Sequence, residues 1–375
     1  MHLLYPFSEP LPLDRARGLQ VISTVAALAR AGISVECSYV PVIANHETVD
    51  PFDHYGVIKP AGVTIRPIAR NLPWPLSRLH SHRFFVWRWL RQVAAKMDAP
   101  WVLVRHLKLA AAIIQALPQA RVLYEAHEVF SDTSSAEKKK KNFLLEQFVY
   151  TRCHAVIANS AATAHRLKAL YGERAHCVVI PNGVDRPLQL PHKAWANANQ
   201  HVLYAGSFFP WKGVHTLVNA AKFLSGTRIT LIGGDATRTA ELQAIAPTEG
   251  AQVVFAGRMS HTNTMQALAT ACIAVLPNLD DTDSRFTSPI KLFEYMAAGC
   301  AIVASDLPAL REILGEDDAV WVPAGDAYAL AQGIRTLIKE PQRAQQLGER
   351  VYARAKAFTW DARAQRIQAL LQQAR

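Results

Sequence analysis

The sequence predicts an α/β protein built from two doubly wound domains. Short β-branched runs alternate with segments of 3.6-residue apolar spacing along most of the 375 residues, a pattern typical of parallel sheets with helices on both faces. A chain of this length also exceeds what one hydrophobic core usually organises. The alternation pauses over residues 181–200, which contain three prolines and several asparagines, so we expect a linker there.

The first predicted domain, residues 1–184, contains seven candidate strands. Helical patterns, such as Leu19, Ile22 and Val25, lie between several of them. The strands are His2–Tyr5, Ser34–Val40, Val63–Pro67, Trp101–Val104, Arg121–Tyr124, Ala155–Ala158 and Cys177–Ile180.

The second predicted domain, residues 185–359, repeats the alternation. A final amphipathic helix over residues 360–375 is expected to pack back on the first domain. Two such domains joined by a hinge should enclose a cleft lined by the carboxyl ends of both sheets, where open α/β sheets bind ligands. The strands are His201–Tyr204, Arg228–Ile232, Gln252–Phe255, Ile273–Leu276, Ala301–Ala304 and Ala319–Val322.

Composition excludes several classes of protein. Half of the residues are hydrophobic and 19% are charged, which is globular composition without a sign of disorder. No apolar run reaches the length of a membrane span, and the N-terminus lacks a basic region and a cleavage site, so a cytoplasmic location is expected. The five cysteines are scattered and no histidine or carboxylate cluster has metal-ligand spacing, so free thiols and no metal site are expected.

Net charge points to an anionic partner. The formal charge is +11, and residues 1–185 hold 22 basic against 14 acidic side chains. Nucleic acid, a phosphorylated substrate or an acidic membrane face would all fit this excess. No helix-turn-helix, RNP or KH signature is present, so nucleic acid is not expected as a partner.

The segment that begins at Ser288 predicts an anion site. Ser288 is expected to cap a helix with Pro289 in its first position, and Gly299 to end it. Free amides of Ile290 and Lys291, with the helix dipole, would bind a diphosphate. Glu294, further along this helix, could accept hydrogen bonds from two vicinal ribose hydroxyls. The alternative is a capped helix with a surface glutamate.

These residues carry a family resemblance. SPIKLFEYMAAGCAIVASDLPALREI, residues 288–313, resembles the nucleotide-binding segment of glycosyltransferase family 4, whose members have the GT-B fold of two facing Rossmann-like domains with an interdomain cleft. VLYAGSFFPWKGVHTLV, residues 202–218, resembles the first strand and loop of the family's C-terminal domain. VVIPNGVD, residues 178–185, resembles its hinge.

The resemblance implies a site. It makes residues 1–184 the acceptor-binding domain and residues 185–359 the donor-binding domain, with His127, Lys212 and Glu294 as catalytic residues. Two departures stand out: Phe286 occupies the position of a frequent carboxylate, and Ser207 that of a frequent arginine. The implied donor-binding residues are Gly206, Ser207, Lys212, Gly257, Arg258, Ser288, Pro289, Ile290, Lys291 and Glu294.

The sequence indicates acceptor-binding residues less specifically than donor-binding ones. Asp14 and Arg17 follow the first strand, and Glu128 follows His127. These three are candidates for acceptor contacts. A capping aspartate with solvated arginines is an equally good interpretation of the segment that holds Asp14 and Arg17.

The resemblance further implies a retaining, metal-independent hexosyltransferase. Its co-substrate would be a UDP- or GDP-linked sugar, with no other cofactor. The expected acceptor is a lipid-linked or surface-polysaccharide precursor. The alternatives are a small soluble acceptor, as in sucrose-like or thiol pathways, and a non-catalytic GT-B scaffold in a polysaccharide assembly complex.

One segment of the first domain suggests a membrane surface. Leu79, Val86, Leu90 and Val93 form a predicted core stripe, which leaves basic residues beside aromatic ones outside it. Such a helix suits peripheral attachment to anionic lipid on the inner face of the cytoplasmic membrane; a buried helix with a basic edge is the alternative. The residues outside the stripe are Arg83, Phe84, Trp87, Arg88 and Arg91.

Overall fold

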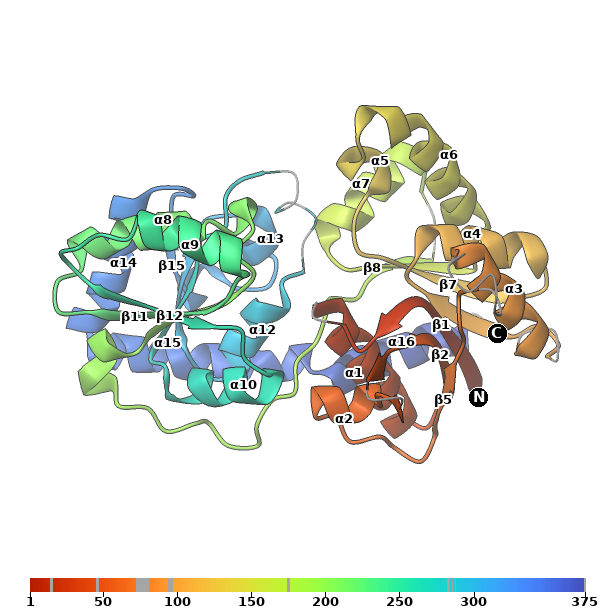
Figure 1. Ribbon diagram of the computed structural model, residues 1–375, viewed down its shortest axis with the longest axis horizontal. Helices are drawn as coiled ribbons and strands as arrows, with labels where there is room; N and C mark the ends of the chain where they lie inside the picture. Colours follow the sequence, from red (N-terminus) through yellow and green to blue (C-terminus); the bar gives the residue numbers. More distant parts are fainter. Residues whose placement is uncertain are drawn as a thin grey trace. The chain divides into compact units, whose positions relative to one another are not determined.

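The structure is a computed structural model that separates into two compact units. Unit 1 comprises Met1–Asn182 and Trp360–Arg375, and unit 2 comprises Gly183–Thr359, so the chain leaves unit 1 two residues before the predicted boundary and returns at the predicted one. Each unit is visible by itself in Figure 1. The described residues are all except 14–15, 45–46, 72–80, 94–96, 174–175, 282–283, 285, 287 and 374–375.

Unit 1 is organised around a seven-stranded parallel sheet of order β5-β2-β1-β6-β7-β8-β9. The order reverses direction between β1 and β6. The strands are β1 (His2–Leu11), β2 (Ser34–Pro41), β5 (Val63–Pro67), β6 (Trp101–Val104), β7 (Arg121–Ala126), β8 (Ala155–Ala158) and β9 (Cys177–Val179).

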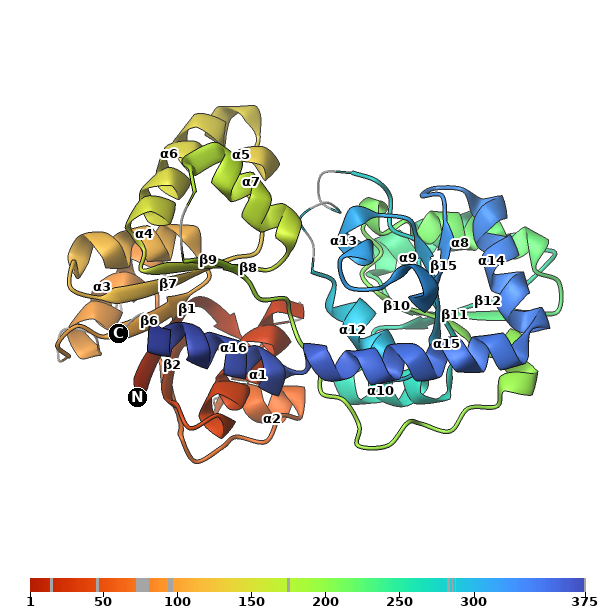
Figure 2. The same cartoon turned by 180° about the vertical axis from the view of Figure 1, so that it is seen from behind.

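Helices cover both faces of this sheet (Figures 1 and 2). Helix α16 (Trp360–Gln373) packs beside α1 (Ala16–Arg30) on one face, while α3, α4 and α6 lie together on the other. The C-terminal helix is therefore part of unit 1. The remaining helices are α2 (Pro51–Tyr55), α3 (His82–Gln92), α4 (Leu107–Ala116), α5 (Phe130–Thr133), α6 (Ala136–Arg152) and α7 (Ala161–Tyr171).

Unit 2 has a six-stranded parallel sheet of order β12-β11-β10-β13-β14-β15, which reverses between β10 and β13. Alternate residues of β10 enter two different cores: Val202 and Tyr204 pack in one, Leu203 and Ala205 in the other. This is what a sheet buried on both faces requires. The strands are β10 (Val202–Gly206), β11 (Arg228–Gly233), β12 (Gln252–Gly257), β13 (Ile273–Leu276), β14 (Ala301–Ser305) and β15 (Val320–Val322).

The two cores of unit 2 are closed by different helices. Side chains of α8 and α14 fill one core, whereas those of α12 fill the other. The helices are α8 (Val214–Ala220), α9 (Ala236–Ala244), α10 (His261–Thr270), α12 (Ile290–Ala297), α13 (Pro308–Arg311), α14 (Ala327–Lys339) and α15 (Pro341–Arg354), with 3-10 turns at Trp195–Gln200, Pro210–Lys212, Ala221–Phe223, Glu316–Asp318 and Ala355–Phe358.

The predicted fold class is confirmed. Every predicted strand is present, and its ends lie within two residues of the prediction except at β1, which runs six residues further to Leu11. The sequence analysis did not predict the short antiparallel pair β3 (Ile43–Ala44) and β4 (Glu47–Thr48), because two-residue strands carry no periodicity.

The predicted core stripe near residue 86 is only partly correct. Phe85 and Trp89 are fully buried and Val93 is nearly so, whereas Val86 and Leu90 are only half-buried. The helix begins at His82 after its cap Ser81, and four-residue spacing from Phe85 places the larger aromatic side chains inward. The fourth predicted member of the stripe, Leu79, lies outside the described residues.

Candidate functional site

Strand order indicates where each unit would bind a ligand. In open α/β sheets the crevice forms at the carboxyl ends of the two strands between which the order reverses. These strands are β10 and β13 in unit 2, and β1 and β6 in unit 1. The predicted donor residue Gly206 ends β10, and Ser207 and Lys212 follow it, which places all three at this end of the unit 2 sheet.

Helix α12 follows β13, but it starts differently from the prediction. Pro289 is the N-cap with extended backbone (φ −73°, ψ 111°), and its own side chain makes no capping hydrogen bond. Ser288 is thus not the cap; its side chain is buried one residue further from the helix. The Pro289 carbonyl accepts from the amide of Leu292 (3.0 Å), so the first turn begins at Ile290.

The end of α12 agrees with the prediction. Gly299 has a left-handed backbone (φ 65°), and its amide donates to the carbonyl of Met296 (3.0 Å) while that of Cys300 donates to Tyr295 (3.0 Å). This pair of bonds is a Schellman motif. A Cβ at Gly299 would meet the end of the exposed Leu190 side chain, which can move aside, so glycine is favoured here by its backbone conformation.

Glu294 is buried and contacted on both of its oxygens. Nζ of Lys291 lies 2.7 Å from its Oε2, and Nε2 of His261 lies 3.4 Å from its Oε1. Burial opposes ionisation, but the charge of Lys291 and the contacts with His261 outweigh it and lower the pKa of Glu294. The carboxylate is 1% exposed, so the surface glutamate alternative is wrong.

His261 is a neighbour of Glu294 that the sequence analysis missed. It is the first residue of α10, after the cap Ser260, which accepts from the amide of Asn263 (3.2 Å). A histidine in the first turn of a helix carries no signal by itself. Only the folded sheet brings the start of α10 beside α12.

Lys212 lies in a short turn that glycine makes possible. Gly213 has φ 64°, and a Cβ there would lie 1.8 Å from the carbonyl oxygen of Pro277, which follows β13. The amide of Leu279 also donates to the carbonyl of Trp211 (2.9 Å). The turn after β10 is therefore packed directly against the segment after β13, at the reversal point of the sheet.

The positive charge of Lys212 is disfavoured in the free chain. Its Nζ lies 3.8 Å from the centroid of the Trp211 ring. Burial, and then the positive charge of Lys291, lower the pKa of Lys212 to about 7, with Asp281 opposing the shift. Two lysines that repel each other in the free chain would both be stabilised by a bound anion.

The remaining donor candidates lie on neighbouring strand ends. A Cβ at Gly233, the last residue of β11, would lie 1.9 Å from the Gly206 carbonyl oxygen, so these two strand ends touch through backbone alone. Ser207 is exposed, and its carbonyl accepts from the hydroxyl of Tyr204 (2.7 Å). Arg258 follows Gly257 at the end of β12, and its Nε donates to the carbonyl of Gly234 (2.8 Å).

In unit 1, His127 follows β7 and lies beside a buried carboxylate. Its Nε2 is 3.2 Å from Oε1 of Glu125, and Glu125 is 1% exposed. Burial and the charge of Arg105 lower the pKa of His127 to about 4, although Glu125 acts in the opposite direction. His127 is therefore a neutral imidazole at physiological pH. The sequence analysis missed Glu125, since a carboxylate inside a strand is normally interpreted as surface.

The acceptor candidates occupy different settings. Arg17 pairs with Glu9 of β1 (2.6 Å), and Glu128 accepts from the hydroxyl of Thr133 in α5 (2.8 Å). Asp14 lies outside the described residues.

A stacked histidine pair, also missed, lies at the reversal point of unit 1. The rings of His82 and His106 are 5.1 Å apart, and Nδ1 of His82 lies 3.0 Å from Oγ of Ser8 in β1. His106 follows β6, and its Nδ1 is buried without a partner in the described part of the chain. These side chains supply polar groups where a ligand of unit 1 would bind.

Among the described residues, no group of three metal-binding side chains occurs, and the five cysteines are free and buried. No described helix has the length and apolar character needed to span a bilayer.

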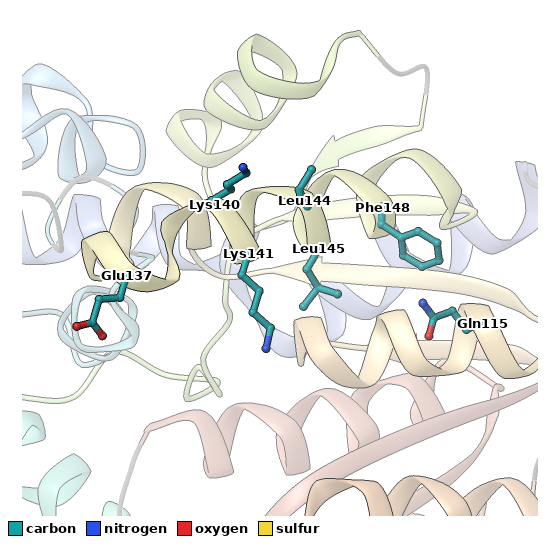
Figure 3. A pocket seen from close by; sticks show the side chains of 7 residues that line it. All are labelled: Gln115, Glu137, Lys140, Lys141, Leu144, Leu145 and Phe148. Atoms are coloured by element: carbon teal, nitrogen blue, oxygen red, sulfur yellow. The ribbon is translucent and has the colours of Figure 1, made fainter.

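A hollow of about 580 Å³ lies away from these residues, between α4 and α6 (Figure 3). Leu145 and Phe148 of α6 point toward Gln115 of α4, while Lys140 points away from it. None of the predicted site residues lines this hollow.

Comparison with known proteins covers both units. The family described as Glycosyltransferase Family 4 matches residues 19–186, and Glycosyl transferases group 1 matches residues 199–340. Similar solved structures include sucrose-phosphate synthase from Thermosynechococcus elongatus (TM-score 0.78, 20% identity, 99% of this chain and 98% of that chain). HepE from Anabaena in complex with UDP-glucose also matches (TM-score 0.72, 17% identity, 100% of both chains).

Curated relatives are similar over part of the chain. A phosphatidyl-myo-inositol mannosyltransferase from Mycobacterium leprae is 30% identical over 171 residues, which are 43% of this chain and 44% of the relative. A D-inositol 3-phosphate glycosyltransferase from Kineococcus radiotolerans is 26% identical over 260 residues, 59% and 57% of the two chains. The first of these matches spans less than half of the relative's length. With both family matches in chain order on two Rossmann-like units, the chain belongs to the GT-B glycosyltransferases of the family 4 type.

Proposed function

We propose that this chain transfers a hexosyl group from a nucleoside-diphosphate sugar to an acceptor, with retention of anomeric configuration. Unit 2 would bind the donor and unit 1 the acceptor. Lys212 carries this proposal, because its ammonium is disfavoured by burial and by Lys291 in the free chain. A diphosphate would relieve that repulsion and bind both cations.

The donor would be held by three kinds of contact. Lys212 and the amides of Ile290 and Lys291 would bind the diphosphate at the start of α12. Glu294 would accept from the ribose, since each of its oxygens has a second lone pair beyond those facing Lys291 and His261. The solved complexes of HepE with UDP and UDP-glucose favour a uridine nucleotide as the first donor to test, with GDP-linked sugars next.

Stabilisation of the charge that develops in the transition state would accelerate the transfer. Negative charge grows on the leaving diphosphate, and Lys212 with the α12 amides would stabilise it by preorganised electrostatics. Retention through a covalent intermediate needs a carboxylate at the anomeric carbon. Glu125 is already engaged by several donors, so we favour front-side attack assisted by the donor phosphate, with His127 hydrogen-bonded to the sugar.

The acceptor is proposed to be lipid-linked. The curated relatives include enzymes named for phosphatidyl-myo-inositol and for D-inositol 3-phosphate. Helix α3 supports the lipid option because Trp87 is 54% exposed and stacks against Arg91 at 4.9 Å. We therefore propose a cytoplasmic protein that attaches peripherally to the inner face of an anionic membrane.

A donor screen tests this function. The purified chain would be incubated with UDP-, GDP- and ADP-linked hexoses and a panel of acceptors, with nucleotide release as the readout. We expect release that depends on both substrates with at least one donor. Lys212→Met should lower that rate, whereas Lys222→Met, an exposed lysine on the same unit, should not. No acceptor-dependent release with any donor would contradict the proposal.

A non-catalytic GT-B scaffold is the second candidate, because Phe286 and Ser207 replace a frequent carboxylate and arginine. Thermal shift separates the two. A nucleotide at a hundred times its dissociation constant stabilises the folded chain by about 2.7 kcal/mol. A Tm that does not move with UDP, GDP or ADP would favour the scaffold.

A further inference from the structure

The buried carboxylate of Glu125 accepts hydrogen bonds from three segments of unit 1. Gln20 donates to its Oε1 (2.8 Å) and Tyr5 to its Oε2 (3.2 Å). Arg363 of the C-terminal helix also donates to Oε1. These contacts hold the carboxylate in a single place at the end of β7.

Glu125 is ionised in this environment. Burial acts against the charge, but Arg363 and then His127 outweigh it and hold the pKa of Glu125 far below its usual range. A carboxylate of this kind only accepts hydrogen bonds. Whatever faces its Oε1 must therefore present a proton.

His127 faces Oε1 through Nε2, which is buried and has no regular hydrogen-bond partner among the described residues. A neutral imidazole carries one proton. A lone pair on Nε2 would be repelled by the carboxylate 3.2 Å away, whereas an N–H would be attracted. The proton is therefore favoured on Nε2, which leaves the lone pair on Nδ1.

The backbone of His127 is fixed independently. Nδ2 of Asn159, which follows β8, donates to the His127 carbonyl (3.0 Å), and the Asn159 amide donates to the carbonyl of Ala126 (3.0 Å). The imidazole therefore has a clamped backbone on one side and a charged neighbour on the other. Its remaining freedom is the choice of tautomer and ring rotation.

Arg363 links this histidine to the segment where the chain leaves unit 1. Its Nη1 donates to the carbonyls of Ile180 and Pro181 (2.7 Å each), while its Nη2 donates to Glu125. The side chain is 3% exposed. One guanidinium therefore holds the C-terminal helix, the end of β9 and the carboxylate beside His127 together.

We propose that Glu125 and Arg363 are positioning residues that hold His127 in the tautomer protonated at Nε2, so that Nδ1 serves as a hydrogen-bond acceptor for a hydroxyl of the sugar substrate. This proposal rests on the proposed role of His127 in transfer. It assigns to the C-terminal helix a part in the chemistry of a residue 236 positions earlier in the chain. Neither Glu125 nor Arg363 touches the substrate in this scheme.

The tautomer is measurable without any activity. Long-range proton–nitrogen correlation spectra of the 15N-histidine-labelled chain distinguish the two ring nitrogens, and His127→Gln identifies the His127 signals. We expect a protonated Nε2 in the wild type. Glu125→Gln replaces the carboxylate by a group that both donates and accepts, so we expect a mixture of tautomers or the Nδ1-protonated form.

Transfer kinetics provide the second readout. Glu125→Gln and Arg363→Met should each lower kcat at least tenfold while the KM for the donor changes less than threefold. Arg363→Lys should recover only part of the rate, since one ammonium does not reproduce the bridge to two carbonyls and a carboxylate. Arg366→Met is the matched control: this arginine is exposed, lies one turn further along α16 and donates to the Val179 carbonyl.

A wild-type His127 protonated at Nδ1 would overturn the proposal. So would Glu125→Gln with an unchanged tautomer and an unchanged kcat. If Arg366→Met lowers kcat as much as Arg363→Met does, the loss comes from weakened docking of the C-terminal helix and not from the position of His127. If no donor supports transfer at all, the proposed function fails, and the spectra of the wild type and of Glu125→Gln still decide the positioning of His127.

Discussion

Nζ of Lys291 lies 2.7 Å from Oε2 of Glu294, one turn further along the same helix. An ion pair at this spacing on an exposed surface contributes little, but Glu294 is buried. We predict that Glu294→Gln lowers kcat/KM for the donor at least tenfold, about 1.4 kcal/mol of transition-state stabilisation. The ribose would lose a charged acceptor, and Lys291 would lose its partner. Initial rates at varied donor concentration measure this.

A matched control exists for that substitution. Glu340 and Arg343 form an ion pair of the same spacing with both side chains about half exposed. Glu340→Gln should leave kcat/KM within twofold of the wild type. Equal losses in the two variants would remove Glu294 from the donor site.

The lowered pKa of Lys212 leads us to predict that nucleotide binding depends on pH. Its pKa is about 7 in the free chain, and a bound diphosphate would raise it. Below pH 7 the ammonium is already present, so binding takes up no proton. Above pH 7 binding must take up a proton, so affinity should fall as pH rises, by at most about tenfold per pH unit. Calorimetry in two buffers of different ionisation enthalpy should show proton uptake at pH 8 and little at pH 6.

The variant Lys212→Met tests the source of that proton. It should bind nucleotide more weakly and abolish the uptake at pH 8. Lys222→Met, which replaces an exposed lysine ten positions later, should retain both the affinity and the uptake. Uptake that persists in Lys212→Met would assign the proton to another group.

The contacts of Lys193 lead us to predict that this residue stabilises the fold without taking part in catalysis. Its ammonium is buried and donates to the carbonyls of Leu268 (2.8 Å), Ala269 (3.1 Å) and Ala271 (2.6 Å) at the end of α10. Lys193→Met would remove the charged donor that these three carbonyls share, and would leave Leu268 and Ala271 with the weakly donating thiol of Cys300 (3.5 and 3.4 Å). We expect a loss of about 2 kcal/mol or more in the free energy of unfolding, measured in urea. Lys339→Met, an exposed lysine in the last turn of α14, should cost less than about 0.5 kcal/mol.

The exposed basic and aromatic side chains of helix α3 lead us to predict membrane binding. Arg83 and Arg91 are exposed beside Trp87, whereas Arg88 donates to the carbonyls of Ala69 and Asn71 (2.6 Å each) and Phe84 is half-buried. The variant Arg83→Gln with Arg91→Gln should bind roughly tenfold less to vesicles of phosphatidylglycerol and phosphatidylcholine in equal parts. Flotation at low and high salt measures this, and binding should fall with salt.

The control for flotation lies in unit 2. Lys222→Gln with Arg228→Gln removes two exposed charges of the same sign and should bind like the wild type. No flotation of the wild type with anionic vesicles would rule out the lipid surface and favour a soluble acceptor.

The strands were predictable because their signal is local. Runs such as Trp101–Val104 and Ile273–Leu276 are buried on both faces and match the structure residue for residue. The start of α12 was not predictable to the same precision. Ser288 before Pro289 satisfies every rule for a cap, yet the extended backbone of Pro289 moves the first turn to Ile290.

Residues of the candidate site could be proposed from the sequence where one short segment holds several of them. Lys212 lies in such a turn, and Glu294 with Lys291 in such a helix. His261, Glu125 and Arg363 could not be found in this way. Each is chemically ordinary in its own segment, and 238 positions separate Glu125 from Arg363. Such pairs become visible only when sheet order is known.

Unit 2 is an insertion within unit 1, because the last helix of unit 1 is separated from the rest by residues 183–359. During synthesis the sheet of unit 1 would leave the ribosome long before α16. The face of α1 that packs against α16, and the carboxylate of Glu125, would therefore remain exposed to solvent while unit 2 folds. Unit 2 is contiguous and suits expression as a fragment. Unit 1 is not contiguous. Its expression alone would require a gene in which residues 360–375 are joined by a linker to residues 1–182.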